Sequence, residues 1–149
     1  MNVDVEIVKS VPRTTEAIGI PVAPTGAVPR QLGLGRAALT LHGFEGKAGQ
    51  VLVIPTATGP TLIAVGIGDP NQLDAKGLRN AAASLVRAAG KRASITTSLA
   101  DLDGVDAKTA TQAVVEGVLL AAYRYIGLKT DTSGASSLST LSLVVDSDD

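Results

Sequence analysis

The chain has 149 residues, enough for one domain with a substantial core, and its 45% apolar but only 2% aromatic content predicts a core built from Ala, Val, Leu and Ile. Thirteen basic and fourteen acidic residues give a net charge of -1, which supplies no chain-wide positive field for nucleic acid or an anionic membrane. The absence of cysteine excludes disulfides, thiolate metal ligands and a cysteine nucleophile, and it fits a cytoplasmic protein.

The first residues do not form a basic leader followed by a long apolar run, and no segment approaches about 18 consecutive apolar residues. We therefore expect neither a secretion signal nor a membrane span.

The first third of the chain predicts two strands and a short helix. Apolar and acidic residues alternate over residues 3–8, which is typical of a half-buried strand. Residues 18–22 predict a second strand, for which Pro21 favours an edge position because proline lacks the N–H donor of an inner strand. Residues 31–42 predict a short helix whose apolar side carries Leu34, Ala38 and Leu41.

The middle of the chain predicts a hairpin followed by a helix. Residues 50–54 and 61–67 are apolar runs separated by a Pro- and Gly-containing turn, as expected of two buried strands. Asp74 is a suitable cap for a helix that ends near Gly90. The apolar side of this helix consists of Leu78, Ala82, Leu85, Val86 and Ala89.

The last third predicts a strand, a long helix and a final strand. Residues 95–99 form the first of these, and Asp106 caps a helix that ends at Gly127. The apolar side of that helix consists of Ala110, Val114, Val118 and Ala122, widened by Val115, Leu119 and Ile126. A polar stretch at 130–137 precedes a strand at 138–145. This order of elements predicts a mixed α/β sandwich.

Two glycine motifs suggest phosphate binding but lack residues that it requires. Gly66-Ile67-Gly68 follows an apolar strand, as in a dinucleotide-binding loop, yet the third glycine is missing, so a tight turn is favoured. Gly46-Lys47 resembles part of a P-loop, but the upstream glycine and the Ser or Thr after the lysine are absent. Lys47 is therefore interpreted as a solvated loop charge.

The remaining polar residues favour structural roles. His42 is the only histidine and is interpreted as a loop-edge residue rather than a catalytic one. Asp106 is assigned to helix capping, and the neighbouring Asp101 and Asp103 to loop solvation rather than calcium binding. Positive residues lie near the C-terminal end of the first long helix, and we interpret them as stabilising the helix dipole rather than as a nucleic-acid surface. They are Arg87, Lys91 and Arg92, with Arg79 earlier in the helix.

Several segments, taken in order, resemble the N-terminal domain of leucyl aminopeptidases. They are the Phe-x-Gly-x-x-Gly turn at 44–49, the strand ending Val-Gly-Ile-Gly at 65–68, Leu78-Arg79 with its Ala-rich helix, and Glu116-Gly117-x-x-Leu120-x-x-Tyr123. The resemblance runs from about residue 37 to residue 129, and the first thirty-odd residues match only loosely. Ile67 and Tyr125 stand where other members often carry Leu and Phe.

The resemblance implies a macro-domain-like fold, a three-layer α/β/α sandwich with a mixed central sheet. Members of the family are metalloproteases that remove N-terminal residues from peptides, commonly with two zinc or manganese ions. They are cytosolic hexamers with the catalytic domains at the centre. In the strongest segment, Gly117 is expected to let its helix approach the sheet, Leu120 and Tyr123 are neighbours on the helix surface, and Glu116 is a solvated or interface charge.

No segment matches the catalytic or metal-binding motifs of the family, so we assign no catalytic, cofactor-binding or metal-binding residue to this chain. We interpret residues 1–129 as a non-catalytic N-terminal domain, and residues 130–149 as a linker and last strand leading toward an absent C-terminal catalytic domain. The two metal ions belong to that absent domain, and the isolated chain is expected to be inactive.

Two alternatives stay open at this point. A stand-alone macro-like module would bind a nucleotide or ADP-ribose beyond the strand ends, near residues 66–69. DNA binding, which occurs in some aminopeptidases of this family, is the other.

Overall fold

The computed structural model describes residues 3–127 and 138–145, and within them one six-stranded sheet. Its spatial order is β1-β6-β5-β2-β4-β3, and every neighbouring pair is parallel except β3 with β4. The strands are β1 (Asp4–Val8), β2 (Ala17–Val22), β3 (Val51–Ile54), β4 (Thr61–Gly66), β5 (Ser94–Thr97) and β6 (Thr140–Val144). The sequence correctly predicted the antiparallel hairpin, which is β3–β4.

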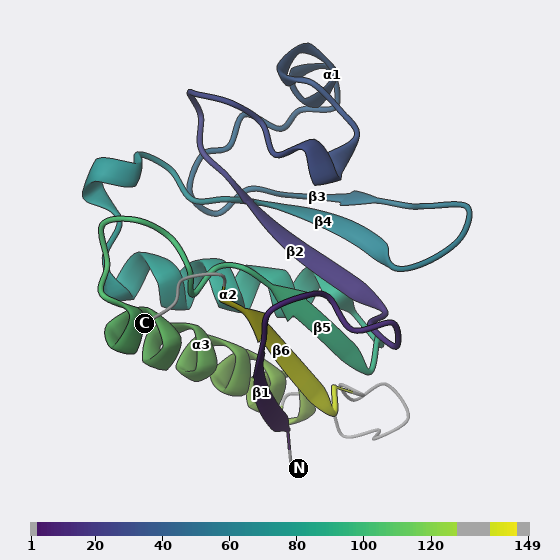
Figure 1. Cartoon of the computed structure of the whole chain (residues 1–149), viewed down its shortest axis with the longest axis vertical. Coiled ribbons are helices and arrows are strands. Elements are labelled where there is room, and N and C mark those ends of the chain that lie inside the picture. Colours follow the sequence, from purple (N-terminus) through teal and green to yellow (C-terminus); the bar gives the residue numbers. More distant parts are fainter. Residues whose placement is uncertain (1–2, 128–137, 146–149) are drawn as a thin grey trace.

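Helices cover the two faces of the sheet unequally. The long helices α2 (Ala75–Ala89) and α3 (Ala107–Gly127) pack together on one face, as Figure 1 shows. The short helix α1 (Arg36–Leu41) and the 3₁₀ turn η1 (Arg30–Leu32) lie over the other face, at β2 and β4. A second 3₁₀ turn, η2 (Pro70–Gln72), connects β4 to α2. This arrangement confirms the predicted α/β sandwich with a mixed central sheet.

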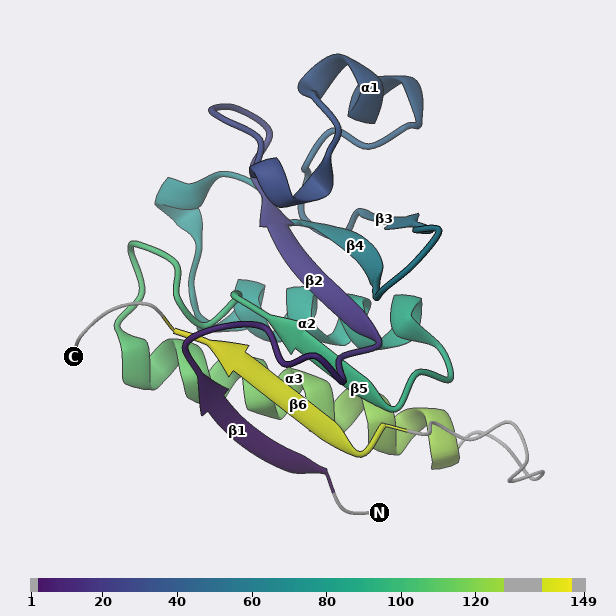
Figure 2. The same cartoon turned by 45° about the vertical axis from the view of Figure 1, so that its right-hand side comes forward.

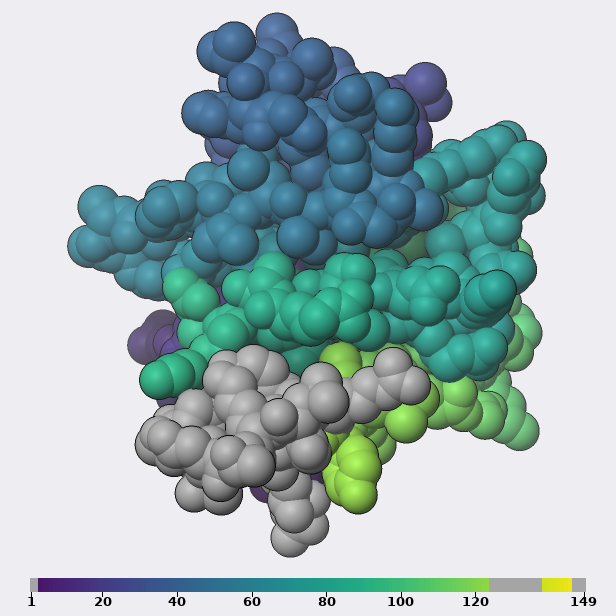
Figure 3. All heavy atoms as spheres, turned by 180° about the vertical axis from the view of Figure 1, so that it is seen from behind, coloured from purple at the N-terminus to yellow at the C-terminus, as the bar shows by residue number. Residues whose placement is uncertain are grey.

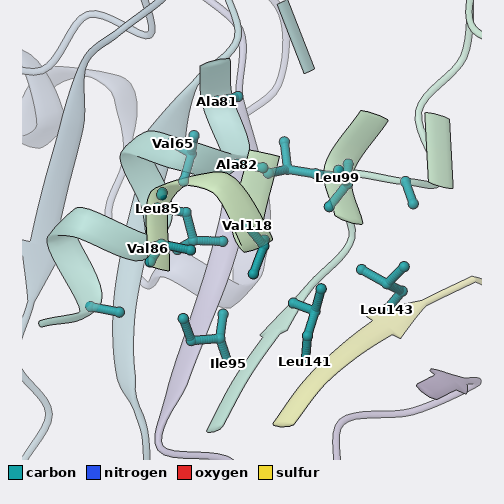
Figure 4. Packing of buried hydrophobic residues seen from close by; sticks show 14 of the residues in the cluster. Val65, Ala81, Ala82, Leu85, Val86, Ile95, Leu99, Val118, Leu141 and Leu143 are labelled. Atoms are coloured by element: carbon teal, nitrogen blue, oxygen red, sulfur yellow. The ribbon is translucent and has the colours of Figure 1, made fainter. Parts of the chain in front are cut away.

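The main core lies between the sheet and the two long helices. All five α2 residues predicted for the apolar side are buried here (Leu78, Ala82, Leu85, Val86 and Ala89). Figure 4 shows Ala82, Leu85 and Val86 in the same cluster as the strand residues Ile95, Leu141 and Leu143. The α3 prediction holds for its central positions but not for Leu119, which is 38% exposed on the outer side of the helix. Small side chains at the α2–α3 contact explain why the two helices approach closely.

A smaller core lies on the opposite face. Phe44, the one phenylalanine, is fully buried there and packs with Leu39 of α1 and Ile20 of β2. Over β5 and β6, the segment that links β1 to β2 covers this face instead, as Figure 2 shows. The Thr15 and Thr96 hydroxyls hydrogen-bond to each other and fix this segment to β5.

Three local predictions are wrong, each because the surroundings outweigh the local rule. β2 is an inner strand rather than an edge strand; its pairing with β5 covers only Ala17–Gly19, so Pro21 lies beyond it and needs no N–H donor there. β3 is an edge strand rather than a buried one, with Val51 37% and Val53 41% exposed.

The helix predicted at 31–42 is divided into η1 and α1, with Gly33 and Gly35 between them. Its buried leucines are Leu32 and Leu39.

Residues 140–144 belong to the same sheet as the rest of the chain, because β6 pairs with β1 on one side and β5 on the other. The predicted polar loop at 130–137 lies outside the described residues, as does the side chain of the predicted helical position Ile126. Within the ranges that the structure describes, no helix combines the length and apolarity that crossing a bilayer requires.

Asp106 caps α3, as predicted. Its carboxylate accepts a hydrogen bond from the Thr109 backbone N–H at 3.0 Å, and its carbonyl accepts one from Ala110 at 2.9 Å. Hydrogen bonds from Thr109 hold the pKa of the Asp106 carboxyl below its ordinary value. Because the pKa is lower in the folded state, the ionised Asp106 carboxylate stabilises the fold fully at pH values above the unfolded-state pKa. This stabilisation is lost as the pH falls through the folded-state pKa.

We therefore expect Asp106→Ala to lower the free energy of unfolding at neutral pH and to have a smaller effect at pH 3. Urea unfolding of the wild type and the variant at both pH values measures this difference. Asp103→Ala is the matched control, because it removes an exposed aspartate from the same loop. An Asp106→Ala effect of equal size at both pH values would contradict a role for the ionised cap.

Candidate functional site

The loop between α1 and β3 is held in one shape by its own hydrogen bonds. The side-chain oxygen of Gln50 accepts from the backbone N–H groups of Glu45, at 2.9 Å, and Lys47, at 3.1 Å. The Lys47 ammonium lies 3.3 Å from the Glu45 carboxylate, and both side chains are more than half exposed. Exposed ion pairs of this kind contribute little to the stability of the fold. The structure thus agrees with the interpretation of Lys47 as a solvated loop charge.

This loop packs against the end of β4, where the sequence suggested a phosphate crevice. The backbone N–H of Gly66 donates to the Gln50 carbonyl at 2.8 Å, and that of Gly68 donates to the Gly46 carbonyl at 3.0 Å. The N–H of Ile67 donates to the Val22 carbonyl at 3.1 Å. A phosphate cradle needs backbone donors that point at the ligand. All three donors at this turn already have partners within the chain.

The space beside Gly66 is also filled by protein. A β-carbon at this position would overlap the carbonyl oxygen of Lys47 and lie 2.9 Å from the carbonyl carbon of Gly46. The nearby depression holds about 220 Å³ and is lined almost entirely by small or apolar residues, with Asn80 as its one polar side chain. Ligand pockets are commonly about 300–1,000 Å³. The geometry therefore favours the tight-turn interpretation over the dinucleotide loop.

The candidate metal ligands do not gather. His42 ends α1 on the surface, where its backbone N–H donates to the Ala38 and Leu39 carbonyls. In the described part of the chain, no three His, Asp or Glu side chains lie close enough together to hold an ion. A two-metal hydrolytic site needs several such ligands around each ion. The described residues do not fit that requirement.

Arg87 and Arg92, at the end of α2 and just beyond it, have local hydrogen-bond partners. Both terminal guanidinium nitrogens of Arg92 donate: one to the Ala89 carbonyl at 2.9 Å, the other to the Thr61 hydroxyl at 3.0 Å. Arg92 thereby satisfies a carbonyl at the C-terminal end of α2, in line with the predicted dipole role. Arg87 donates to the Ser84 hydroxyl at 3.3 Å, and Lys91 is exposed.

The Glu116-Gly117 segment joins α3 to α2. The Glu116 carboxylate lies 3.4 Å from the Arg79 guanidinium, with both side chains about two-fifths exposed, and its other oxygen accepts from Gln112 at 3.0 Å. A β-carbon on Gly117 would overlap the Arg79 carbonyl oxygen and lie 3.0 Å from the Ala82 β-carbon. The expectation that Gly117 faces the sheet is wrong, because the glycine faces the backbone of the neighbouring helix.

Leu120 and Tyr123, from the same segment, point outward and are 59% and 70% exposed. The sequence analysis identified Leu120 and Tyr123 as neighbours on the helix but did not recognise that they form an exposed apolar surface. The available signal was the outer side of α3, where apolar residues occur at positions that an amphipathic surface helix normally gives to polar ones. This outward-facing apolar surface is the feature that most clearly suggests an interaction.

The described residues thus define a mixed α/β domain with no gathered metal ligands, a blocked glycine crevice and an apolar helix surface. Comparisons with known proteins are consistent with this description. Residues 27–132 match the family model described as "Cytosol aminopeptidase family, N-terminal domain". The chain belongs to the cytosol aminopeptidase family, in which it corresponds to the N-terminal domain.

The curated relatives are much longer than this chain. A probable cytosol aminopeptidase of Thermosynechococcus vestitus is 33% identical over 92 residues, which cover 59% of this chain and 18% of the relative. One from Mycobacterium leprae is 29% identical over 107 residues, covering 71% and 20% respectively. The chain therefore spans about a fifth of the length of the relatives it matches.

The solved structures that this chain resembles are also much longer than it. The bottromycin maturation enzyme BotP matches with a TM-score of 0.68 and 30% identity, over 90% of this chain and 28% of that one. A mutant of tomato leucine aminopeptidase matches with a TM-score of 0.77 over 98% of this chain and 33% of that one. Its identity is 16%, so it shows the shared fold alone.

Proposed function

We propose that this chain is the non-catalytic N-terminal domain of a metal-dependent leucyl aminopeptidase that removes N-terminal amino acids from peptides in the cytoplasm. Its role is to support assembly of the enzyme, as a hexamer, and access to an active site built by a C-terminal catalytic domain. The observation that carries the proposal is the match of residues 27–132 to the N-terminal domain of the family, rather than to a catalytic one.

The potential metal ligands among the described residues support the assignment of catalysis to another domain. The two zinc or manganese ions of such an enzyme would polarise the peptide carbonyl and activate water. The one histidine, His42, is exposed just after the end of α1, and no carboxylate cluster stands beside it within the described ranges. We therefore place the metal ions in the catalytic domain and assign no step of the reaction to this chain.

The isolated chain is expected to hydrolyse no leucine p-nitroanilide above the uncatalysed rate, with either Mn²⁺ or Zn²⁺ in excess. Titration calorimetry with each metal is expected to show no stoichiometric binding. Hydrolysis that survives repurification, or one equivalent of tightly bound metal, would contradict the proposal. The wild-type chain with EDTA provides the background rate.

No observation favours the nucleotide-binding alternative over this function. In the crevice near residues 66–69, the backbone N–H groups of Gly66, Ile67 and Gly68 are already hydrogen-bonded within the chain, and the adjoining depression is small and poor in polar groups.

A further inference from the structure

An open groove of about 490 Å³ lies between the two long helices. The small residues Ala83, Gly117 and Ala121 line it, and Leu120 lines its α3 side. Figure 3 views the molecule from the side of the long helices, with α2 across the middle and part of α3 below it. Because the lining residues are small, large side chains of a partner have room to enter between the helices.

Apolar side chains continue from this groove onto the outer side of α3. Leu120 and Tyr123 are 59% and 70% exposed, and Leu119 is 38% exposed. Residues three and four apart are neighbours on a helix surface, so Tyr123 lies beside both leucines. Single exposed apolar residues are common on proteins, but a contiguous strip beside a groove marks an interaction surface.

The charged side chains that line the groove are both basic. They are Arg79 and Arg87, eight residues apart on α2, which is about 12 Å along a helix. Asn80 and Ser84 add neutral hydrogen-bonding groups, and no carboxylate is among the described residues that line the groove. The surrounding sequence has the same bias, because residues 75–92 contain no Asp or Glu. The basic residues of this stretch are Lys76, Arg79, Arg87, Lys91 and Arg92.

Both arginines of the groove can bind a further carboxylate. Arg87 is exposed, donates to the neutral Ser84 hydroxyl at 3.3 Å, and forms no ion pair within the part of the chain that the structure describes. The Arg79 guanidinium contacts the Glu116 carboxylate through one nitrogen, at 3.4 Å. A guanidinium has five N–H donors, so this single contact leaves Arg79 able to donate to a second carboxylate.

We propose that the α2–α3 groove binds an acidic amphipathic helix of a partner protein. The apolar side of that helix packs on Leu120, Tyr123 and the small residues of the groove. Two of its carboxylates, two helical turns apart, pair with Arg79 and Arg87. Two turns span about 11 Å, close to the separation of the two arginines along α2. Apolar anchors are the usual basis of helix-in-groove binding, and complementary charges fix the orientation.

Two other occupants match this surface less well. Phosphates of a nucleic acid would meet the arginines but leave Leu120 and Tyr123 without an apolar contact, and the net charge of -1 supplies no wider positive field. A second copy of the chain must be complementary to the same face of the first. The groove lining would present it with cations and offer no carboxylate in return.

Selection from a displayed library of random peptides tests the proposal without assuming a sequence. The peptides have about 16 residues, which is roughly four helical turns. The purified chain is the bait. Enriched peptides are expected to carry Asp or Glu two helical turns apart, with large apolar residues between them. Fluorescence anisotropy then measures the affinity of the strongest synthesised peptide for the wild type and for each variant.

Charge reversal tests the role of the groove arginines. Arg87→Glu is expected to weaken binding of that peptide by roughly tenfold or more. Arg30→Glu is the matched control, because it changes the net charge equally but lies on η1, over the other face of the sheet. It is expected to bind like the wild type. A peptide with Lys in place of its acidic residues is expected to bind Arg87→Glu better than it binds the wild type.

The apolar contact is tested in the same assay. Leu120→Ser is expected to weaken binding by roughly tenfold, because it removes an anchor point beside the groove. Leu41→Ser is the matched control, since Leu41 is 85% exposed on α1 and its loss is expected to leave the affinity unchanged. Circular dichroism confirms that each variant is folded.

Several results would overturn the inference. They are a library without enriched peptides, enriched peptides without acidic residues, and equal losses of affinity in Arg87→Glu and Arg30→Glu. Duplex DNA that displaces the peptide at about 150 mM salt would assign the groove to nucleic acid instead. A wild-type dimer in sedimentation equilibrium that Leu120→Ser abolishes would assign it to a second copy. None of these measurements depends on the hydrolysis and metal-binding results that test the proposed function, so the two proposals can fail separately.

Discussion

Gly117→Ala is expected to lower the free energy of unfolding by about 1–3 kcal/mol, the usual cost of overpacking. Alanine forms helices better than glycine by about 1 kcal/mol, so propensity alone predicts the opposite sign. The added methyl would overlap the Arg79 carbonyl oxygen and approach the Ala82 β-carbon to 3.0 Å. Because the carbonyl belongs to the backbone of α2, relief requires the two helices to separate. Urea unfolding measures the change.

Gly77→Ala is the matched control, since this glycine also lies in a long helix. A methyl there meets only side-chain atoms, Leu73 Cδ1 at 3.3 Å and Asp74 Oδ1 at 3.4 Å. We expect no loss of stability, or a gain of up to about 1 kcal/mol. If Gly117→Ala stabilised the chain as much as Gly77→Ala, the close contact between α2 and α3 would be disproved.

The two long helices could be predicted well because their signals are local. The apolar side of α2 was identified residue by residue, since burial repeats with the period of the helix and Asp74 and Gly90 mark its ends. The order of the strands in the sheet could not be predicted in this way. The placement of β6 between β1 and β5 depends on pairing between distant segments, and no local pattern contains it. Pro21 was misjudged for the same reason.

The surfaces were harder to predict than the core. A glycine in the sequence indicates that another part of the chain packs closely against it, but it does not show which element does so. Gly117 was assigned to the sheet, and the structure shows a helix in that place. Leu119 was counted on the buried side because it widens an apolar stripe, yet the width of the contact is set by α2 and not by α3 itself. Residue spacing along one helix cannot specify how much of it a neighbour covers.

The largest loss of stability is expected for Gly66→Ala, about 2–4 kcal/mol from overpacking together with weakened hydrogen bonds. A methyl at this position overlaps the Lys47 carbonyl oxygen, which is held in place by the Gln50 backbone N–H at 3.0 Å. Accommodating it moves the loop away from β4 and disturbs the 2.8 Å hydrogen bond from Gly66 to the Gln50 carbonyl. Thermal and urea unfolding without any ligand measure the effect.

Lys47→Ala is the control that separates backbone from side chain. It removes an exposed ammonium but leaves the Lys47 carbonyl in place, so the expected change is within about 0.5 kcal/mol. The pair of variants also discriminates between the two functions. If Gly66 were kept open for a phosphate, Gly66→Ala would leave the free chain stable and remove a stabilisation of the wild type by ADP-ribose. A large loss in the free chain, with no thermal shift from ADP-ribose in the wild type, would show that the glycine serves packing.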